Sequence, residues 1–392
     1  MVIRTSVLVV LTALTGCTEN GRHRDREEDA GVSVPVPVPV SIDCASDTAC
    51  ALFSDGTVRC WGGAGDYGLG DPLNMDPGPV PVLVEGVSRV RSVHVSPTGF
   101  VCAIQEDGHL ACWGESDSGE ILGVLGGTKT PIVAQGIEDV RDVSASGAMH
   151  VLLEDGRVLA WGDNSLGAIG DGTDEDRLEP VTVFERGILS VEALLAVGER
   201  GNVWCWGPNW KGLTGEESLM GWKLSPGVFP GLNYVAGLDL RADEVACAWT
   251  RGGEAYCWGH NASGQIVLPP GEKFASPVRI DTPAVIRRAS VGAHTVCVLL
   301  ESGAVHCQGL VLGGGSTARP LEPTAGLRPV EDVCVGYDAA CALEREPPRV
   351  VCWGYNYEGQ LGRAGPDSLT PVPVEFPDLP PVEIPDDEGG SP

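Results

Sequence analysis

The sequence predicts an all-β protein built from seven copies of a repeat about 50 residues long. Three observations predict it: a recurring Trp-Gly pair, a glycine at a fixed distance before almost every pair, and a composition rich in turn-forming residues. The chain of 392 residues contains 54 glycines and 30 prolines, and both residues interrupt helices. Short apolar runs between such residues are typical of strands.

The Trp-Gly pair recurs along the chain at intervals of 52, 48, 45, 52, 50 and 45 residues. Its tryptophans are Trp61, Trp113, Trp161, Trp206, Trp258 and Trp353, and the sixth of the seven copies has Gln308 instead. Repeated large aromatic residues usually fill a core, so we expect these side chains to pack between the repeats. Four tryptophans fall outside the repeat position: Trp204, Trp210, Trp222 and Trp249.

The segment before each Trp-Gly pair predicts a β-hairpin. If Cys50 faces Cys60, a three-residue loop ending at Gly56 remains between the strands. Such a loop needs a left-handed residue at its last position, where glycine has no steric penalty. Six copies have this glycine five residues before the tryptophan or its replacement: Gly56, Gly108, Gly156, Gly201, Gly253 and Gly303. The last copy has Pro347 and Pro348 there.

After each Trp-Gly pair comes a turn-rich stretch, and a proline further on is expected to open another strand, as at Pro131 and Pro180. Each repeat therefore holds about four short strands, enough for one blade of a β-propeller. The segments CALFSDGTVRCWG, CAIQEDGHLACWG and CWGYNYEGQLG resemble the regulator-of-chromosome-condensation repeat family. The resemblance covers residues 41–376 and implies a seven-bladed propeller.

The sequence offers two candidate segments for closing the ring. We expect a strand from one terminus to complete the blade begun at the other. Either the valine-proline stretch near Val36 or the strand near Pro371 could serve. Valine and proline alternate from Val34 to Val40, which predicts either a semi-rigid spacer or an edge strand that accepts proline.

Fourteen cysteines suit an exported protein better than a reducing cytoplasm. Five pairs flank hairpins: Cys50 and Cys60, Cys102 and Cys112, Cys247 and Cys257, Cys297 and Cys307, Cys341 and Cys352. The three-residue-loop register places the first four pairs opposite each other. We expect each pair to form a disulfide, because the spacing matches no metal-binding pattern. Cys44 and Cys334 become neighbours if the ring closes, which suggests a sixth bridge, and Cys205 has no partner in this scheme.

The first residues predict export and lipidation. Arg4 is followed by a short apolar stretch, and Leu14-Thr15-Gly16-Cys17 resembles the lipobox of bacterial lipoproteins. This implies a signal peptide over residues 1–16 and a lipidated Cys17, and Thr18 favours the outer membrane. Residues 17–40 read as a charged, Val-Pro-rich tether, residues 41–376 as the propeller, and residues 377–392 as an acidic, Pro-rich tail.

Composition and motifs exclude several classes of function. The formal net charge is −28, which opposes nucleic-acid binding. No phosphate-binding loop, nucleophile elbow or metal-ligand spacing occurs, so we expect no cofactor, no metal and no catalytic residues. Ser54-Asp55-Gly56 lacks the spacing of a sialidase Asp-box. His294, in a position where the family often has histidine, is expected to be structural.

The leading functional prediction is therefore a non-enzymatic, protein-binding or scaffolding propeller displayed at the cell envelope. Its partner would be an envelope or extracellular protein, and it would contact the membrane only through its lipid anchor. Two alternatives are weighed. The resemblance implies a guanine-nucleotide-exchange-like regulator, as in the family's founding member, and the central channel of a propeller allows an envelope hydrolase or lyase acting on polysaccharides. Export and the acidic charge argue against the first alternative.

Overall fold

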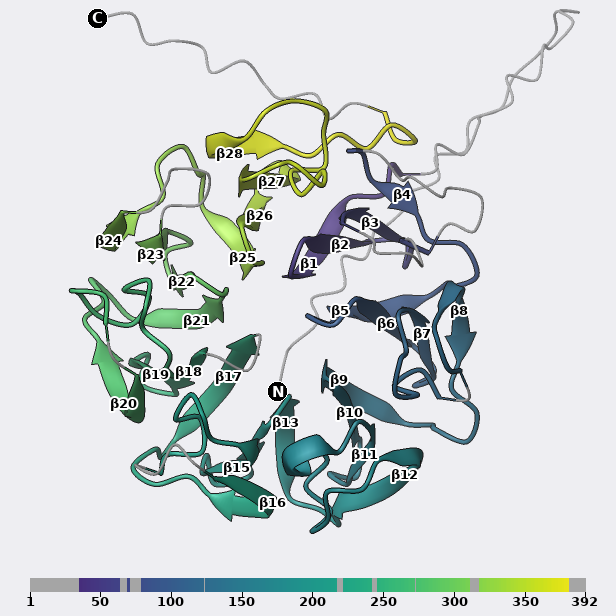
Figure 1. Cartoon of the computed structure of the whole chain (residues 1–392). Helices are drawn as coiled ribbons and strands as arrows, with labels where there is room; N and C mark the ends of the chain where they lie inside the picture. Colours follow the sequence, from purple (N-terminus) through teal and green to yellow (C-terminus); the bar gives the residue numbers. More distant parts are fainter. Residues whose placement is uncertain are drawn as a thin grey trace, which may run out of the picture. The chain divides into compact units, whose positions relative to one another are not determined.

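The computed structural model describes residues 35–63, 69–70, 79–122, 124–216, 221–241, 245–271, 273–310 and 317–380. The signal peptide, Cys17, most of the tether and residues 381–392 of the tail lie outside these residues. From Val36 onward, seven four-stranded antiparallel sheets are arranged around a common centre (Figure 1). The predicted all-β, seven-bladed propeller is confirmed.

Each blade begins at the centre of the ring and proceeds outward through four consecutive strands (Figure 1). The innermost strands are β1 (Pro39–Ala45), β5 (Val90–Val95), β9 (Val140–Ser146), β13 (Ile188–Glu192), β17 (Val235–Arg241), β21 (Ile286–Val291) and β25 (Val330–Val335). The second strands are β2 (Thr48–Phe53), β6 (Phe100–Gln105), β10 (Ala148–Leu153), β14 (Leu195–Gly198), β18 (Val245–Thr250), β22 (Thr295–Leu300) and β26 (Ala339–Arg345).

The third strands carry the Trp-Gly pairs and the fourth strands form the rim. The third strands are β3 (Val58–Gly62), β7 (Leu110–Gly114), β11 (Val158–Gly162), β15 (Val203–Pro208), β19 (Ala255–Gly259), β23 (Val305–Leu310) and β27 (Pro348–Gly354). The fourth are β4 (Val82–Leu83), β8 (Thr128–Val133), β12 (Arg177–Phe184), β16 (Trp222–Val228), β20 (Phe274–Ile280), β24 (Ala318–Pro323) and β28 (Ser368–Pro373). A short 3-10 turn, η2 (Ser165–Gly167), follows β11.

Burial explains why the middle strands read as continuous apolar runs. All five residues of β3 and β7 are buried, because both faces of a blade pack against neighbouring blades. The rim strands are mostly half-buried, and their prolines lie within the strands: Pro131 in β8 and Pro180 in β12. The prediction that proline opens these strands is therefore wrong. A rim strand has a partner on one side only, so a missing N–H can face solvent.

The hairpins have the predicted register, and their turn glycines also contact the next blade. Cys50 lies opposite Cys60 and Leu52 opposite Val58, and all six predicted glycines have positive φ, as at Gly56 (+78°). The Gly56 carbonyl also accepts the backbone N–H of Val90, at the start of the next blade. A Cβ on Gly56 would lie 2.8 Å from the Cα of Arg89, so the next blade also excludes a side chain there.

The repeated tryptophans join each blade to the preceding one. All six are buried. Among the described residues, four of them donate from the indole Nε1 to the carbonyl of the residue seven positions after the preceding blade's tryptophan. These bonds are Trp61 to Gln360 (3.1 Å), Trp161 to Glu120 (2.9 Å), Trp206 to Ala168 (2.8 Å) and Trp258 to Leu213 (3.1 Å). Gln308 replaces a tryptophan yet makes the same bond, from its amide to the Gln265 carbonyl at 2.8 Å.

The ring closes without a strand shared between the termini. Every sheet consists of four consecutive strands, so the expected closure by a strand from one terminus is wrong. Pro39 and Val40 of the valine-proline stretch begin β1, which is the inner edge of its own sheet. We call the boundary between the seventh blade (β25–β28) and the first (β1–β4) the seam.

Two connections hold the seam. A disulfide joins Cys44 of β1 to Cys334 of β25 with a Cα–Cα distance of 5.6 Å. Further out, residues 374–380, which we call the C-terminal strap, extend from the seventh blade onto the first. Phe376 packs edge-on against Phe53 with ring centroids 5.1 Å apart, and Asp378 pairs with the buried Arg59 at 2.7 Å. Residues 377–380, assigned to the tail from sequence, thus pack on the ring.

Removing the seam disulfide is expected to destabilise the protein more than removing a hairpin disulfide. The seam bridge closes a segment of 290 residues and the Cys50–Cys60 bridge one of 10. A bridge that closes a longer loop removes more conformational entropy from the unfolded chain. We therefore expect Cys44→Ala with Cys334→Ala to lower the unfolding free energy by about 5 kcal/mol. The matched double variant Cys50→Ala with Cys60→Ala should lose about 3 kcal/mol. Urea denaturation without reductant measures both, and equal losses would contradict the expectation.

Candidate functional site

The centre of the ring is lined by polar residues at one repeated position. On every innermost strand this residue lies opposite the first hairpin cysteine of its blade, or opposite the residue in that cysteine's place. We call these seven residues the channel ring: Asp43, His94, Ser144, Glu192, Asp239, Ser290 and Cys334. A cavity of about 260 Å³ at this centre is lined by five of the seven, all except Ser290 and Cys334.

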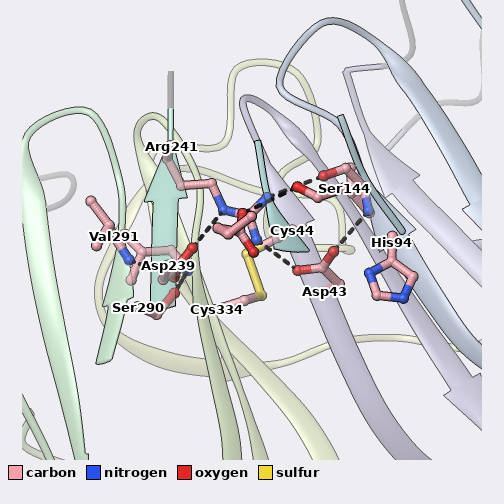
Figure 2. Close-up of polar contacts among 12 residues, drawn as sticks. Asp43, Cys44, His94, Ser144, Asp239, Arg241, Ser290, Val291 and Cys334 are labelled. Atoms are coloured by element: carbon pink, nitrogen blue, oxygen red, sulfur yellow. Dashed lines mark hydrogen bonds and ion pairs between the residues drawn. A yellow bond between two sulfur atoms is a disulfide. The ribbon is translucent and has the colours of Figure 1, made fainter. Parts of the chain in front are cut away.

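Side chains of the channel ring bind the backbone of the next blade (Figure 2). The donor is the N–H one position beyond the next blade's own channel-ring residue. The four bonds are Val95 N to Asp43 Oδ2 (2.7 Å), Ala193 N to Ser144 Oγ (2.8 Å), Val291 N to Asp239 Oδ2 (2.9 Å) and Val335 N to Ser290 Oγ (3.1 Å). Cys44 stands one position beyond Asp43, so the Cys334–Cys44 disulfide occupies the place of this bond at the seam.

Arg241 of β17 crosses the channel and joins blades that are not neighbours (Figure 2). Its Nη2 lies 3.0 Å from Asp43 Oδ1 on β1, and its Nε lies 3.3 Å from Asp239 Oδ1 on its own strand. Burial alone would lower the pKa of Arg241, but the surrounding carboxylates Asp43, Asp239 and Glu192 raise it above its usual range. The guanidinium therefore stays charged and ties the first and fifth blades together.

Three further charged residues, Asp142, Arg288 and Asp332, each lie two positions before a channel-ring residue. Arg288 of β21 pairs with Asp332 of β25 at 2.5 Å, and His94 Nε2 lies 3.9 Å from Asp142 Oδ1. Burial raises the pKa values of both Asp142 and Asp332 above their ordinary range. These pairs again link neighbouring blades.

Among the channel carboxyls, Glu192 has the fewest contacts that would stabilise its negative charge. The Ser144 hydroxyl lies 3.5 Å from its Oε1. Burial, followed by repulsion from the Asp239 carboxylate, raises the pKa of Glu192 well above its ordinary value. Such a carboxyl can hold a proton, but the groups around it are engaged in contacts between blades. The described residues contain no group of three His, Cys, Asp or Glu side chains that could hold a metal ion.

The structure pairs all ten cysteines predicted to form hairpin disulfides. Each pair has a Cα–Cα distance of 4.1 Å, as at Cys102–Cys112, slightly shorter than typical for non-hydrogen-bonded positions. Cys205 lies opposite Leu195 and is a free, buried thiol. Burial raises the pKa of Cys205, and the Lys223 amine lies 3.6 Å from its sulfur.

Sequence reasoning missed the residues that shape the loops after the Trp-Gly pairs. An asparagine three residues after the tryptophan accepts, through its side-chain oxygen, the backbone N–H five residues further on. The four bonds are Ile169 to Asn164 (2.9 Å), Thr214 to Asn209 (2.9 Å), Ile266 to Asn261 (2.8 Å) and Leu361 to Asn356 (2.9 Å). The fixed Trp-Gly-x-Asn spacing was a signal that could have identified them.

These loops and the turns between first and second strands lie at the same end of the ring. We call this end the Trp-Gly face. The hairpin turns containing Gly56 and its equivalents form the opposite end. Trp210 follows β15 on the Trp-Gly face and is 52% exposed, and Tyr337 and Tyr357 there are 45% and 58% exposed. Tyr234 is 72% exposed and lies at the opposite end, beside the hairpin turn at Gly201.

Replacing the channel carboxyl Glu192 is expected to change the pH dependence of stability. Because its folded pKa lies above the ordinary 4.5, the folded state binds more protons and the unfolding free energy falls as pH rises through that window. Glu192→Gln removes this effect. One pKa unit corresponds to about 1.4 kcal/mol, so we expect a gain of that order at neutral pH that disappears in acid.

Urea denaturation at several pH values tests this expectation. Glu199→Gln, at an exposed position, is the matched control and should leave the pH profile unchanged. A Glu192→Gln protein that is less stable than the parent at neutral pH would show that the carboxylate is needed in its charged form.

Comparisons with known proteins agree with this architecture. No protein-family profile matches the chain. Human E3 ubiquitin-protein ligase HERC2 is 29% identical over 80% of this chain and 6% of that ligase, and the ultraviolet-B receptor UVR8 of Arabidopsis thaliana is 27% identical over 57% of this chain and 54% of that receptor. The chain thus spans about half or less of the length of these curated relatives.

Among solved structures, human WBSCR16 has the same fold, with a TM-score of 0.70 and 20% identity over 82% of this chain and 95% of that one. The described part of the present chain contains no helix long and apolar enough to span a membrane. The repeat motif, the sequence matches and the seven blades together support membership of the regulator-of-chromosome-condensation repeat family.

Proposed function

We propose that this protein is an exported, lipid-anchored propeller that binds another protein through its Trp-Gly face. The observation that carries the proposal is the set of exposed aromatic side chains on the varied loops of that face, such as Trp210 and Tyr357. Protein interfaces are enriched in tryptophan and tyrosine. Loops held by a rigid scaffold are common positions for recognition residues.

The scaffold supports this proposal because it is rigid. Six disulfides staple it, and the channel ring, the tryptophans and Arg241 join its blades. Stable disulfides are typical of exported proteins, which fits the lipobox-like sequence ending at Cys17. Little conformational entropy would be lost when such loops bind a partner.

The alternatives have less support. An exchange-factor-like regulator would work in a reducing cytoplasm, where these disulfides would not persist. A channel hydrolase or lyase would need an available acid and base, whereas the channel carboxylates Asp43 and Asp239 contact Arg241 and hydrogen-bond to neighbouring blades. Binding through the outer loops needs neither condition.

Photo-crosslinking in intact cells tests the binding face. A photo-reactive phenylalanine analogue placed at Trp210 should capture a discrete protein partner, because this side chain is exposed on the Trp-Gly face. The same analogue at Tyr234 is the matched control, since that residue is more exposed but lies at the opposite end. Capture of the same protein only from position 234 would assign binding to the hairpin-turn end, and no specific capture from either would contradict the proposal.

Metabolic labelling with a fatty-acid analogue tests the anchor separately. The parent protein should carry the label and fractionate with the outer membrane, because buried acyl chains each contribute about 0.8 kcal/mol per CH₂ to membrane binding. Cys17→Ala should abolish the label, while Cys205→Ala, which removes the buried free thiol, should not. An unlabelled parent protein with reduced cysteines in the cytoplasm would refute the export.

A further inference from the structure

Three loops that meet at the seam form a compact patch on the Trp-Gly face. Tyr337 and Asp338 lie in the turn between β25 and β26, Tyr357 and Glu358 lie in the loop between β27 and β28, and Asp47 lies in the turn between β1 and β2. We call these five residues the seam patch. They combine two exposed aromatic rings with three carboxylates.

Hydrogen bonds fix the geometry of the seam patch. The Tyr357 hydroxyl donates to Asp338 Oδ2 at 2.8 Å and lies 3.4 Å from Asp47 Oδ1 on the other side of the seam. The Gln360 amide also donates to Asp47 Oδ1, at 3.1 Å. Burial and then the Asp338 carboxylate raise the pKa of Tyr357 above its ordinary value, so the phenol stays neutral and remains a donor. The ring of Tyr357 is thereby held in place while 58% of the residue stays exposed.

Within the described residues, the carboxylates of the seam patch have no cationic partner. No Lys or Arg among the described residues forms an ion pair with Asp47, Asp338 or Glu358. The channel differs, because its carboxylates Asp43 and Asp239 share Arg241. The patch therefore presents uncompensated negative charge beside exposed aromatic faces.

We propose that the seam patch docks a lysine- or arginine-rich segment of the protein partner. Cationic side chains are attracted to aromatic faces within about 6 Å of the ring centroid, and carboxylates form strong charged hydrogen bonds with them. The charge of the whole chain, −28, would also attract such a segment from a distance. This inference rests on the proposed protein-binding function and names the chemistry of the partner.

The seam disulfide contributes by holding the two halves of the patch in register. Cys44 lies three residues before Asp47, and Cys334 lies four residues before Asp338. Their bridge keeps β1 and β25 together at the channel. Asp47 and Asp338 are thus arranged around the Tyr357 hydroxyl before any partner binds, which reduces the entropy lost on binding.

Calorimetric titration of the full lipidated protein in a neutral detergent tests the inference. The probe is a peptide of alternating lysine and glycine, with a glutamate-glycine peptide as its counterpart, at an ionic strength of about 0.15 M. We expect Asp47→Asn with Asp338→Asn to weaken lysine-peptide binding about tenfold or more. Asparagine can still accept the bonds from Tyr357 and Gln360, so the loops should keep their shape.

Matched variants separate the patch from the general acidity of the protein. Asp107→Asn with Asp155→Asn removes the same charge from two exposed hairpin turns at the opposite end and should change the affinity less than twofold. Tyr337→Ser with Tyr357→Ser should also weaken binding, and Tyr234→Ser should not. Equal losses at both ends, equal binding of the two peptides, or no binding at all would each overturn the inference. In any of these cases, crosslinking through Trp210 would still decide the proposed function by itself.

Discussion

The architecture depends on one recurring contact, the bond from the innermost strand of one blade to the backbone of the next. At four junctions a channel-ring side chain, such as Asp43 or Ser290, accepts the N–H of the following blade. At the seam Cys334 and Cys44 occupy the same positions, and a covalent bond stands where a hydrogen bond would be. A buried N–H needs a partner, so at these four junctions one short polar side chain both satisfies the backbone of the next blade and joins the two neighbours.

Much of this fold could be predicted from the sequence because it repeats. The Trp-Gly pairs, the turn glycines and the cysteine spacing each reflect a local geometric requirement, and seven copies made each requirement visible. The hairpin register and even the pairing of Cys44 with Cys334 followed from this reasoning. The glycine at position 56 has an additional reason, contact with the next blade, that a single hairpin cannot reveal.

What could not be predicted depends on contacts between segments far apart in the chain. Arg241 reads as an ordinary charged residue at the end of a strand, yet it pairs with Asp43, 198 residues away. Asp378 lies in a segment that the sequence assigns to an acidic, Pro-rich tail, but it neutralises the buried Arg59 on the first blade. The seam patch is likewise assembled from both ends of the chain. Local pattern cannot show such pairings, because they arise only when the ring closes.

Contiguous blades also bear on how such a ring could change in evolution. Because no sheet combines strands from both termini, a duplicated or deleted repeat would add or remove one complete structural unit without dividing any sheet. Only the junction where the first and last blades meet would have to re-form, and the Cys44–Cys334 bridge lies at that junction. By the same logic, a circularly permuted chain that begins at another inter-blade connection should retain every sheet intact.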